Sequence, residues 1–310
     1  MRRGWQSTPV AHFVISRSRA ALAVMGAAVL FGTTGTSREL LVPDAPGTGV
    51  AAVRLIVGSV GLVAWVLLRG RRADLLRLWR RPVVWVMGAG VAGYQAFFFI
   101  GTQRTGVAIA ALIALGSAPF LSGLLGWAMR EGAPGWVWAA STAIAVIGLG
   151  LLVSGSLATG DALGMLSALG AGACYAVFTV LGVRLSREGF NGGDVLASSF
   201  SIGAVLLAPA VFTSTWWWSV NGVVEALWLG LATTTAAYLL FGIGLSVLQP
   251  GHIATLTLLE PAVATILGVV VLDEPLSALG WMGCLLVIVA LALLGIAERR
   301  TDHDSMGVPA

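Results

Sequence analysis

Ten apolar segments joined by short loops fill nearly the whole chain, and they constrain its fold more than any other feature. Each is about 20 residues long, the length that an α-helix needs to cross a hydrocarbon layer of about 30 Å. The predicted spans are residues 19–40, 47–69, 82–101, 105–128, 134–153, 161–183, 194–213, 222–245, 250–272 and 276–297. Hydrophobic residues make up 57% of the 310 residues and charged residues 10%. A water-soluble domain needs a more polar surface than this composition can provide. We therefore predict an all-α membrane protein with ten transmembrane helices.

The arginines predict how the spans are oriented. All 18 basic residues are arginine, and 15 of them lie in the two tails, in loops that follow even-numbered spans, or at the span ends that adjoin these segments. Because cytoplasmic loops are enriched in basic residues, we expect both tails, residues 1–18 and 298–310, to be cytoplasmic. We expect this membrane to be the cytoplasmic (plasma) membrane. The loop "RGRRADLLRLWRR" at 69–81 is interpreted as a topology determinant, with binding of anionic lipid as the alternative.

A weak internal repeat divides the chain into residues 19–153 and 161–297. Four residue pairs recur at a spacing of 142 to 144: Phe31 with Tyr175, Gly101 with Gly244, Pro119 with Pro261, and Glu131 with Glu274. Each repeat holds five spans, and because five is odd, the second repeat enters the membrane from the opposite side. Two inverted five-helix repeats are an arrangement that secondary transporters use to form a site near the midplane.

Several motifs resemble a known family. The segments "FGTTGTSRE" and "VRLIVGSVGLV", the pattern "P…LLGW…REG…GW" and its echo "LLEP…LG…LDEP…G" are similar to the EamA-type domain, present twice over about residues 19–297. The chain thus resembles the drug/metabolite transporter superfamily. This resemblance implies a ten-helix exporter or importer of small organic molecules, often amino acids, with a cavity lined by spans 1–4 and 6–9. The first copy departs from the pattern, because no acid precedes Pro119, so a role of Glu260 is not expected to be duplicated.

Glu260 is an acid in the middle of the ninth span. A charged acid at that depth costs about 2.5–3.5 kcal/mol, so we expect Glu260 to face a cavity or to be neutral. It is a candidate partner for a substrate amine or a proton-coupling group, and the alternative is a structural hydrogen bond to a neighbouring helix. Pro261 lacks an N–H, which predicts a helix break near the cavity and a free carbonyl at Thr257. Pro119 is predicted to break the fourth span in the same way.

Arg54 is the other deep charge, about 10 Å from the outer end of the second span. It is a candidate partner for a substrate carboxylate or for Glu260; alternatively, it snorkels outward or pairs with Glu39. Four polar side chains are candidates to hydrogen-bond a ligand, with interhelical packing as the alternative for each. They are Tyr94, Gln95, Tyr175 and Tyr238.

Other motifs argue against competing functions. "GAGVAG" at 88–93 fits the dinucleotide fingerprint, but it lies within one apolar span, where glycines instead allow close helix contact. Cys174 and Cys284 lie in apolar segments, as packing residues do. We expect no cofactor, no metal and no nucleic-acid partner. An intramembrane enzyme would need a nucleophile–base pair or metal ligands at membrane depth, and a sensor would usually carry a soluble output domain.

These observations predict a secondary transporter that moves a small organic metabolite by alternating access, with amino acids as the first candidates and export favoured by the resemblance. Glu260 motivates the hypothesis of proton coupling. Multidrug transport, nucleotide-sugar transport and a non-transporting membrane sensor are the alternatives. The expected partners are the small-molecule substrate, membrane lipids and H+, and the sequence leaves open whether the chain forms a homodimer.

Overall fold

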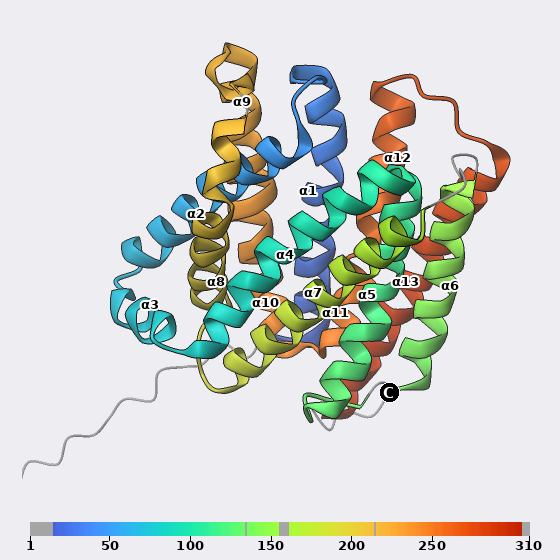
Figure 1. Cartoon of the computed structure of the whole chain (residues 1–310). Helices are drawn as coiled ribbons and strands as arrows, with labels where there is room; N and C mark the ends of the chain where they lie inside the picture. The colour runs from blue at the N-terminus through green and yellow to red at the C-terminus, as the bar shows by residue number, and fades with distance from the viewer. Residues whose placement is uncertain (1–14, 134, 155–160, 214, 306–310) are drawn as a thin grey trace, which may run out of the picture.

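The structure, a computed structural model, describes residues 15–133, 135–154, 161–213 and 215–305 (Figure 1). Over these ranges the chain forms helices and no strand. Nine of the described helical segments are long and apolar enough to cross a membrane, and α6 is a shorter apolar helix. The prediction of an all-α membrane protein is therefore confirmed. The predicted N-terminal tail falls largely outside the described residues.

The first repeat consists of five long helices and one short one. They are α1 (Arg17–Leu41), α2 (Gly47–Leu68), the short α3 (Arg72–Trp79), α4 (Pro82–Thr105), α5 (Val107–Ala128) and α6 (Trp136–Leu152). The second repeat contains three composite spans. Its elements are α7 (Ala162–Arg187), α8 (Gly192–Leu207) with η2 (Ala208–Thr213), η3 (Trp216–Trp218), α9 (Val220–Leu227) with the π-helix η4 (Trp228–Ala236) and α10 (Ala237–Val247), α11 (Pro250–Leu256) with α12 (Leu259–Val271), and α13 (Ala278–Ser305). Every predicted span end lies within four residues of a helix end except the last, because α13 continues into the predicted tail.

The helices pack in a pattern that repeats when the two halves are exchanged. In the first half, α1 contacts α10 and α12; in the second half, α7 contacts the equivalent helices α4 and α5. Equivalent helices also pair directly, as α2 with α8, α5 with α11 and α6 with α13. Glycines occupy matching crossings: a Cβ on Gly101 would lie 3.3 Å from Ala168 on α7, and one on Gly244 would lie 2.3 Å from Val24 on α1. A duplicated five-helix unit produces this exchange symmetry, and the inverted orientation of the second copy stays a prediction.

The arginine-rich loop contains a helix that the hydropathy pattern missed. α3 is amphipathic, since Leu75 and Leu78 are buried while Arg77 is exposed. It is anchored to the second repeat, because the Trp79 Nε1–H donates to Ser201 Oγ at 3.0 Å. A hydropathy window of 20 residues cannot detect a helix of 8.

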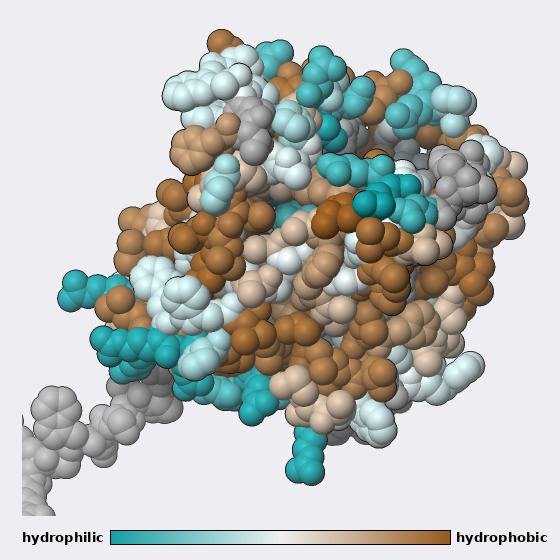
Figure 2. All heavy atoms as spheres, in the orientation of Figure 1, coloured by the Kyte–Doolittle hydropathy of each residue, from teal (hydrophilic) through white to brown (hydrophobic). Residues whose placement is uncertain are grey.

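Apolar side chains cover the flank of the molecule in Figure 2, and hydrophilic ones gather mainly toward its upper and lower ends. The connection between α1 and α2 lies at the upper end in Figure 1, and the end of α13 lies at the lower end. An apolar belt between two polar ends is the surface that a bilayer requires.

The glycines of "GAGVAG" pack between helices, as predicted. A Cβ on Gly88 would lie 2.5 Å from Ile202 on α8, and one on Gly90 would lie 3.3 Å from the Cys174 carbonyl on α7. The absence of side chains here lets α4 approach both neighbours. Cys174 and Cys284 are free thiols.

Candidate functional site

A cavity of about 380 Å³ lies between the two repeats. Its walls come from helices of both halves, chiefly α1, α2, α4 and α5 of the first and α7, α10 and α12 of the second. All six predicted site residues line it: Arg54, Tyr94, Gln95, Tyr175, Tyr238 and Glu260. These residues come from five spans, so the fold gathers groups that are far apart in the sequence. Their role in binding stays a prediction.

Arg54 and Glu260 place opposite charges in this cavity without joining them. In the described part of the chain, neither side chain forms an ion pair or a hydrogen bond with another residue. The two groups nevertheless lie within electrostatic range of each other. The predicted alternative of an Arg54–Glu39 pair is therefore wrong. Two opposite charges that no described side chain pairs with leave room for a ligand that carries both signs.

Several aromatic rings form part of the remaining wall. Tyr94 stacks on Phe98 with centroids 5.8 Å apart, and Tyr238 lies 5.0 Å from Phe31 and 4.2 Å from Phe200. The Tyr175 hydroxyl is 3.1 Å from Thr257 Oγ1, which fixes its ring beside Glu260's helix break. Phe31 and Tyr175 are one of the repeat pairs, so equivalent positions of the two halves face one cavity.

The ninth span is broken immediately before Glu260. α11 ends at Leu256 and α12 begins at Leu259, two residues ahead of Pro261, as the missing N–H predicts. The predicted free carbonyl is wrong, however, because the Thr257 carbonyl accepts the Glu260 N–H at 3.0 Å. A tight turn of this kind satisfies the carbonyl locally and directs the Glu260 side chain to the cavity.

Pro119 does not break its helix, in contrast to the prediction. α5 runs without interruption from Val107 to Ala128, and Pro119 is buried and does not line the cavity. The neighbouring turn is held tightly against α7, where a Cβ on Gly172 would lie 2.2 Å from Ser117 Oγ. Transmembrane helices accommodate proline when close packing of this kind supports the backbone.

The π-helix η4 joins the cavity wall to α2. Thr234 lines the cavity, and its hydroxyl donates to the Leu229 carbonyl of its own helix at 2.8 Å. Thr235 Oγ1 donates to the Gly58 carbonyl of α2 at 3.0 Å. A Cβ on Gly58 would lie 2.2 Å from Thr234 Cγ2, so the glycine allows this contact between the repeats. Wide helical turns of this type often occur at functional sites.

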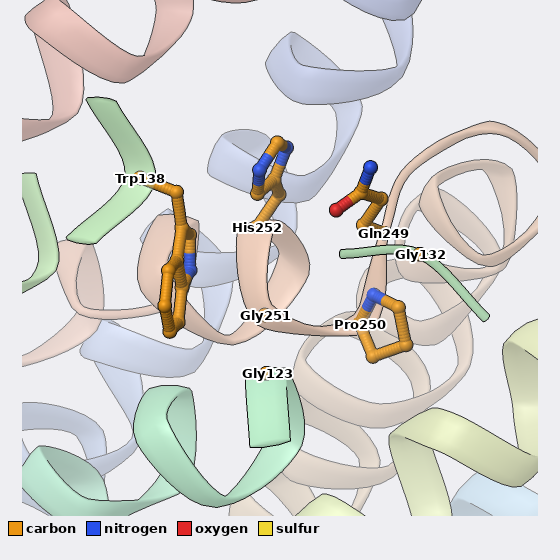
Figure 3. Close-up of a pocket in the computed structure, with 7 residues that line it drawn as sticks. All are labelled: Gly123, Gly132, Trp138, Gln249, Pro250, Gly251 and His252. Carbon is orange, nitrogen blue, oxygen red and sulfur yellow. The ribbon is translucent and has the colours of Figure 1, made fainter. Parts of the chain in front are cut away.

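The two ends of α5 differ in packing. Val107, at its start, lines the cavity and is 67% exposed. Near the opposite end, about 30 Å away by helical rise, lies a cluster that we call the seal (Figure 3). The seal consists of Gly123, Gly132, Trp138, Gln249, Pro250, Gly251 and His252, and the space between these residues is too narrow for a water molecule.

Close backbone approaches and polar bonds join the two repeats at the seal. A Cβ on Gly251 of α11 would lie 2.9 Å from Trp138 Nε1 of α6 and 3.1 Å from the Gly123 Cα. Figure 3 shows the Trp138 ring standing beside this glycine. Nearby, Arg187 Nη1 of α7 donates to Glu131 Oε2 at 3.0 Å. Close packing between the repeats at the seal therefore contrasts with the exposed cavity wall at Val107.

Two charged residues near the cavity were not predicted. Arg38 lines it, and its Nη2 donates to the Ala45 carbonyl at 2.6 Å. Glu225 lies behind the wall and is fully buried. Both fall near predicted span ends, where charged side chains normally reach water, so their position in the sequence gave no signal. Across the described residues, no group of three or more His, Cys, Asp or Glu residues gathers in a way that would hold a metal.

Comparison with known proteins places this fold and cavity in a family. The EamA-like transporter family matches residues 18–154 and again 162–296. The chain belongs to this family. The EamA-like chain is 34% identical over 284 residues to the uncharacterized transporter YwfM of Bacillus subtilis (strain 168), an alignment that covers 90% of this chain and 94% of YwfM.

Other relatives of this EamA-like chain are named for a substrate. It is 28% identical to the threonine/homoserine exporter RhtA of Escherichia coli (strain K12), over 76% of this chain and 78% of RhtA. A solved crystal structure of a protein covers 92% of this chain and 99% of its own, with a TM-score of 0.77 and 22% identity, which supports the fold. The family and its named members are transporters, so the chain is a multi-pass membrane transporter of a small molecule and not an enzyme.

Proposed function

We propose that this transporter exports small zwitterionic metabolites, amino acids first, across the cytoplasmic membrane by alternating access. The observation that carries the proposal is the unpaired Arg54 and Glu260 in one cavity. An amino acid brings a carboxylate for the guanidinium and an ammonium for the acid, and each charge-assisted hydrogen bond contributes about 1.5–3 kcal/mol. The similarity to proteins named threonine/homoserine exporters supports this substrate class and the direction.

The contrast between the two ends of α5 supports alternating access. The cavity opens where Val107 is exposed, and the seal closes the other end with residues of both repeats. Rocking of one repeat against the other would separate Gly251 from Trp138 and close the opposite end around the cargo. With both tails cytoplasmic, as the arginine distribution predicts, the open end faces outward and the seal faces the cytoplasm.

Glu260 is the group that we assign to proton coupling. Among the described residues that line the cavity it is the single acid, so a proton and a cargo ammonium would compete for the same carboxylate. In each cycle, a proton that enters from outside would displace the ammonium and release the cargo. Such competition links the proton gradient to transport without any further site.

The experiment measures threonine uptake into inside-out vesicles with and without a pH gradient. We expect the wild type to be stimulated by the gradient and Glu260→Gln to lose that stimulation. The matched control is Glu274→Gln, which removes an exposed acid of the same repeat. Arg54→Gln should raise the threonine KM by about 10-fold or more, since it removes a charge-assisted bond. Normal, gradient-sensitive transport by Glu260→Gln would rule out the coupling role.

A further inference from the structure

Glu225 on α9 is a fully buried acid beside the cavity, with 0% of its surface exposed. Its Oε1 accepts a hydrogen bond from Ser37 Oγ at 3.0 Å, and Ser37 precedes the cavity-lining Arg38 on α1. Its Oε2 is buried without a hydrogen-bond partner among the described residues. A carboxylate that is only half satisfied inside a protein requires compensating positive charge.

Two arginines supply that charge. Arg38 and Arg54 both line the cavity, and both lie within electrostatic range of Glu225. α9 packs on α1, α2, η3 and η4, and η3 and η4 carry no charged residue. On the neighbouring end of α1, the remaining charge is the exposed Glu39. Among the described residues that pack around Glu225, the cations are therefore the two arginines of the cavity wall.

The sum of these charges bears on what the cavity accepts. The described lining holds Arg38, Arg54 and Glu260, which together carry a net charge of +1 when ionised. Such a lining alone would favour an anionic ligand. Glu225 lies outside the lining, and its negative charge brings the net charge of the four residues to zero. A neutral site with separated charges favours a zwitterion over an anion.

We propose that Glu225 is a specificity-determining residue that makes this cavity select net-neutral zwitterions and reject anions. It would do so without touching the cargo, by offsetting the positive potential of Arg38 and Arg54. The inference rests on the proposed function, since it concerns the same cavity and the same class of cargo. A purely structural Glu225 would affect stability and leave the choice between ligands unchanged.

The test compares threonine with N-acetylthreonine, which keeps the carboxylate and lacks the ammonium, in proteoliposomes containing the full chain. Glu225→Gln keeps an oxygen that can accept from Ser37 and removes the charge. We expect it to shift the kcat/KM ratio of the two ligands toward N-acetylthreonine by about tenfold, the effect of one charge at roughly 10 Å in a partly hydrated protein. Glu39→Gln removes an exposed acid near the same end of α1 and should leave the ratio unchanged.

A second variant protects the test if Glu225→Gln does not fold. Arg38→Gln removes one positive charge, so it should shift the ratio in the opposite direction, and the double variant should return it toward the wild-type value. A folded Glu225→Gln protein with an unchanged ratio would overturn the proposal, as would an equal shift in Glu39→Gln or no shift in Arg38→Gln. If wild-type protein transports neither ligand, the proposed function fails; if it discriminates and the variants do not alter that, only this inference fails.

Discussion

The ion pair beside the seal offers a direct test of how the cavity changes access. Arg187 and Glu131 belong to different repeats, and their atoms are 3.0 Å apart in the sealed state. In the proposed mechanism, rocking of the repeats would separate them, so the pair would stabilise only the state in which the seal is closed. Glu131→Gln keeps the size of the side chain and removes its charge. We therefore expect this substitution to raise the population of molecules whose seal is open.

The size of the effect follows from burial. The Glu131 side chain is 10% exposed and that of Arg187 is 42% exposed, so the pair is neither fully buried nor a surface pair. Surface pairs contribute about 0.2–1 kcal/mol, and breaking a buried pair costs about 3–5 kcal/mol. A value of about 1–2 kcal/mol lies between these limits. It corresponds to a shift of about 5- to 30-fold in the ratio of open to sealed molecules.

The assay is the rate at which a cysteine in the seal reacts with a soluble maleimide. His252→Cys provides the thiol, in a background where Cys174 and Cys284 are replaced by serine. Glu131→Gln should raise the labelling rate by that same factor. Glu274→Gln, at the repeat-equivalent and exposed position, should leave the rate unchanged. A labelling rate that Glu131→Gln does not raise would refute the argument that this pair holds the seal closed.

Two further outcomes concern stability. Gly192→Ala places a Cβ 2.1 Å from the Gly242 carbonyl oxygen, so we expect the free energy of unfolding to fall by about 1–3 kcal/mol. In Gly150→Ala the new Cβ meets nothing within 4 Å, so this variant should be as stable as the wild type or more stable. Equal stability of the two variants would contradict the packing argument. At the start of α7, the hydrogen bond from Arg104 at 2.8 Å holds the pKa of Asp161 below its ordinary value of 3.8. Ionised Asp161 therefore stabilises the fold at neutral pH, and this contribution is lost as the pH falls from 3.8 through the lowered pKa of the folded state. Asp161→Asn should lower the melting temperature at pH 7 by an amount that shrinks toward pH 3, and a difference independent of pH would contradict it.

The sequence determined the spans and most of the cavity's polar residues for the same reason. Exposure to lipid requires long apolar helices, so a polar or charged residue within such a helix is energetically costly and easy to recognise in the sequence. Arg54 and Glu260 could be singled out because a deep charge needs a cavity or a partner. The predicted repeat makes Phe31 and Tyr175 equivalent positions, and both line the same cavity.

Tertiary packing decided what the local sequence left equivalent. Pro119 and Pro261 are repeat partners, yet α5 runs straight through one while the ninth span breaks before the other. Each proline removes the backbone hydrogen bond to the carbonyl four residues before it, so the residues packed around each proline determine whether the helix breaks. Glu225 looks like an ordinary acid near a span end, and only the packing of α9 against α1 and α2 buries it beside two arginines. The sequence specifies which residues carry a charge, but the free energy of each charge depends on which helices surround it.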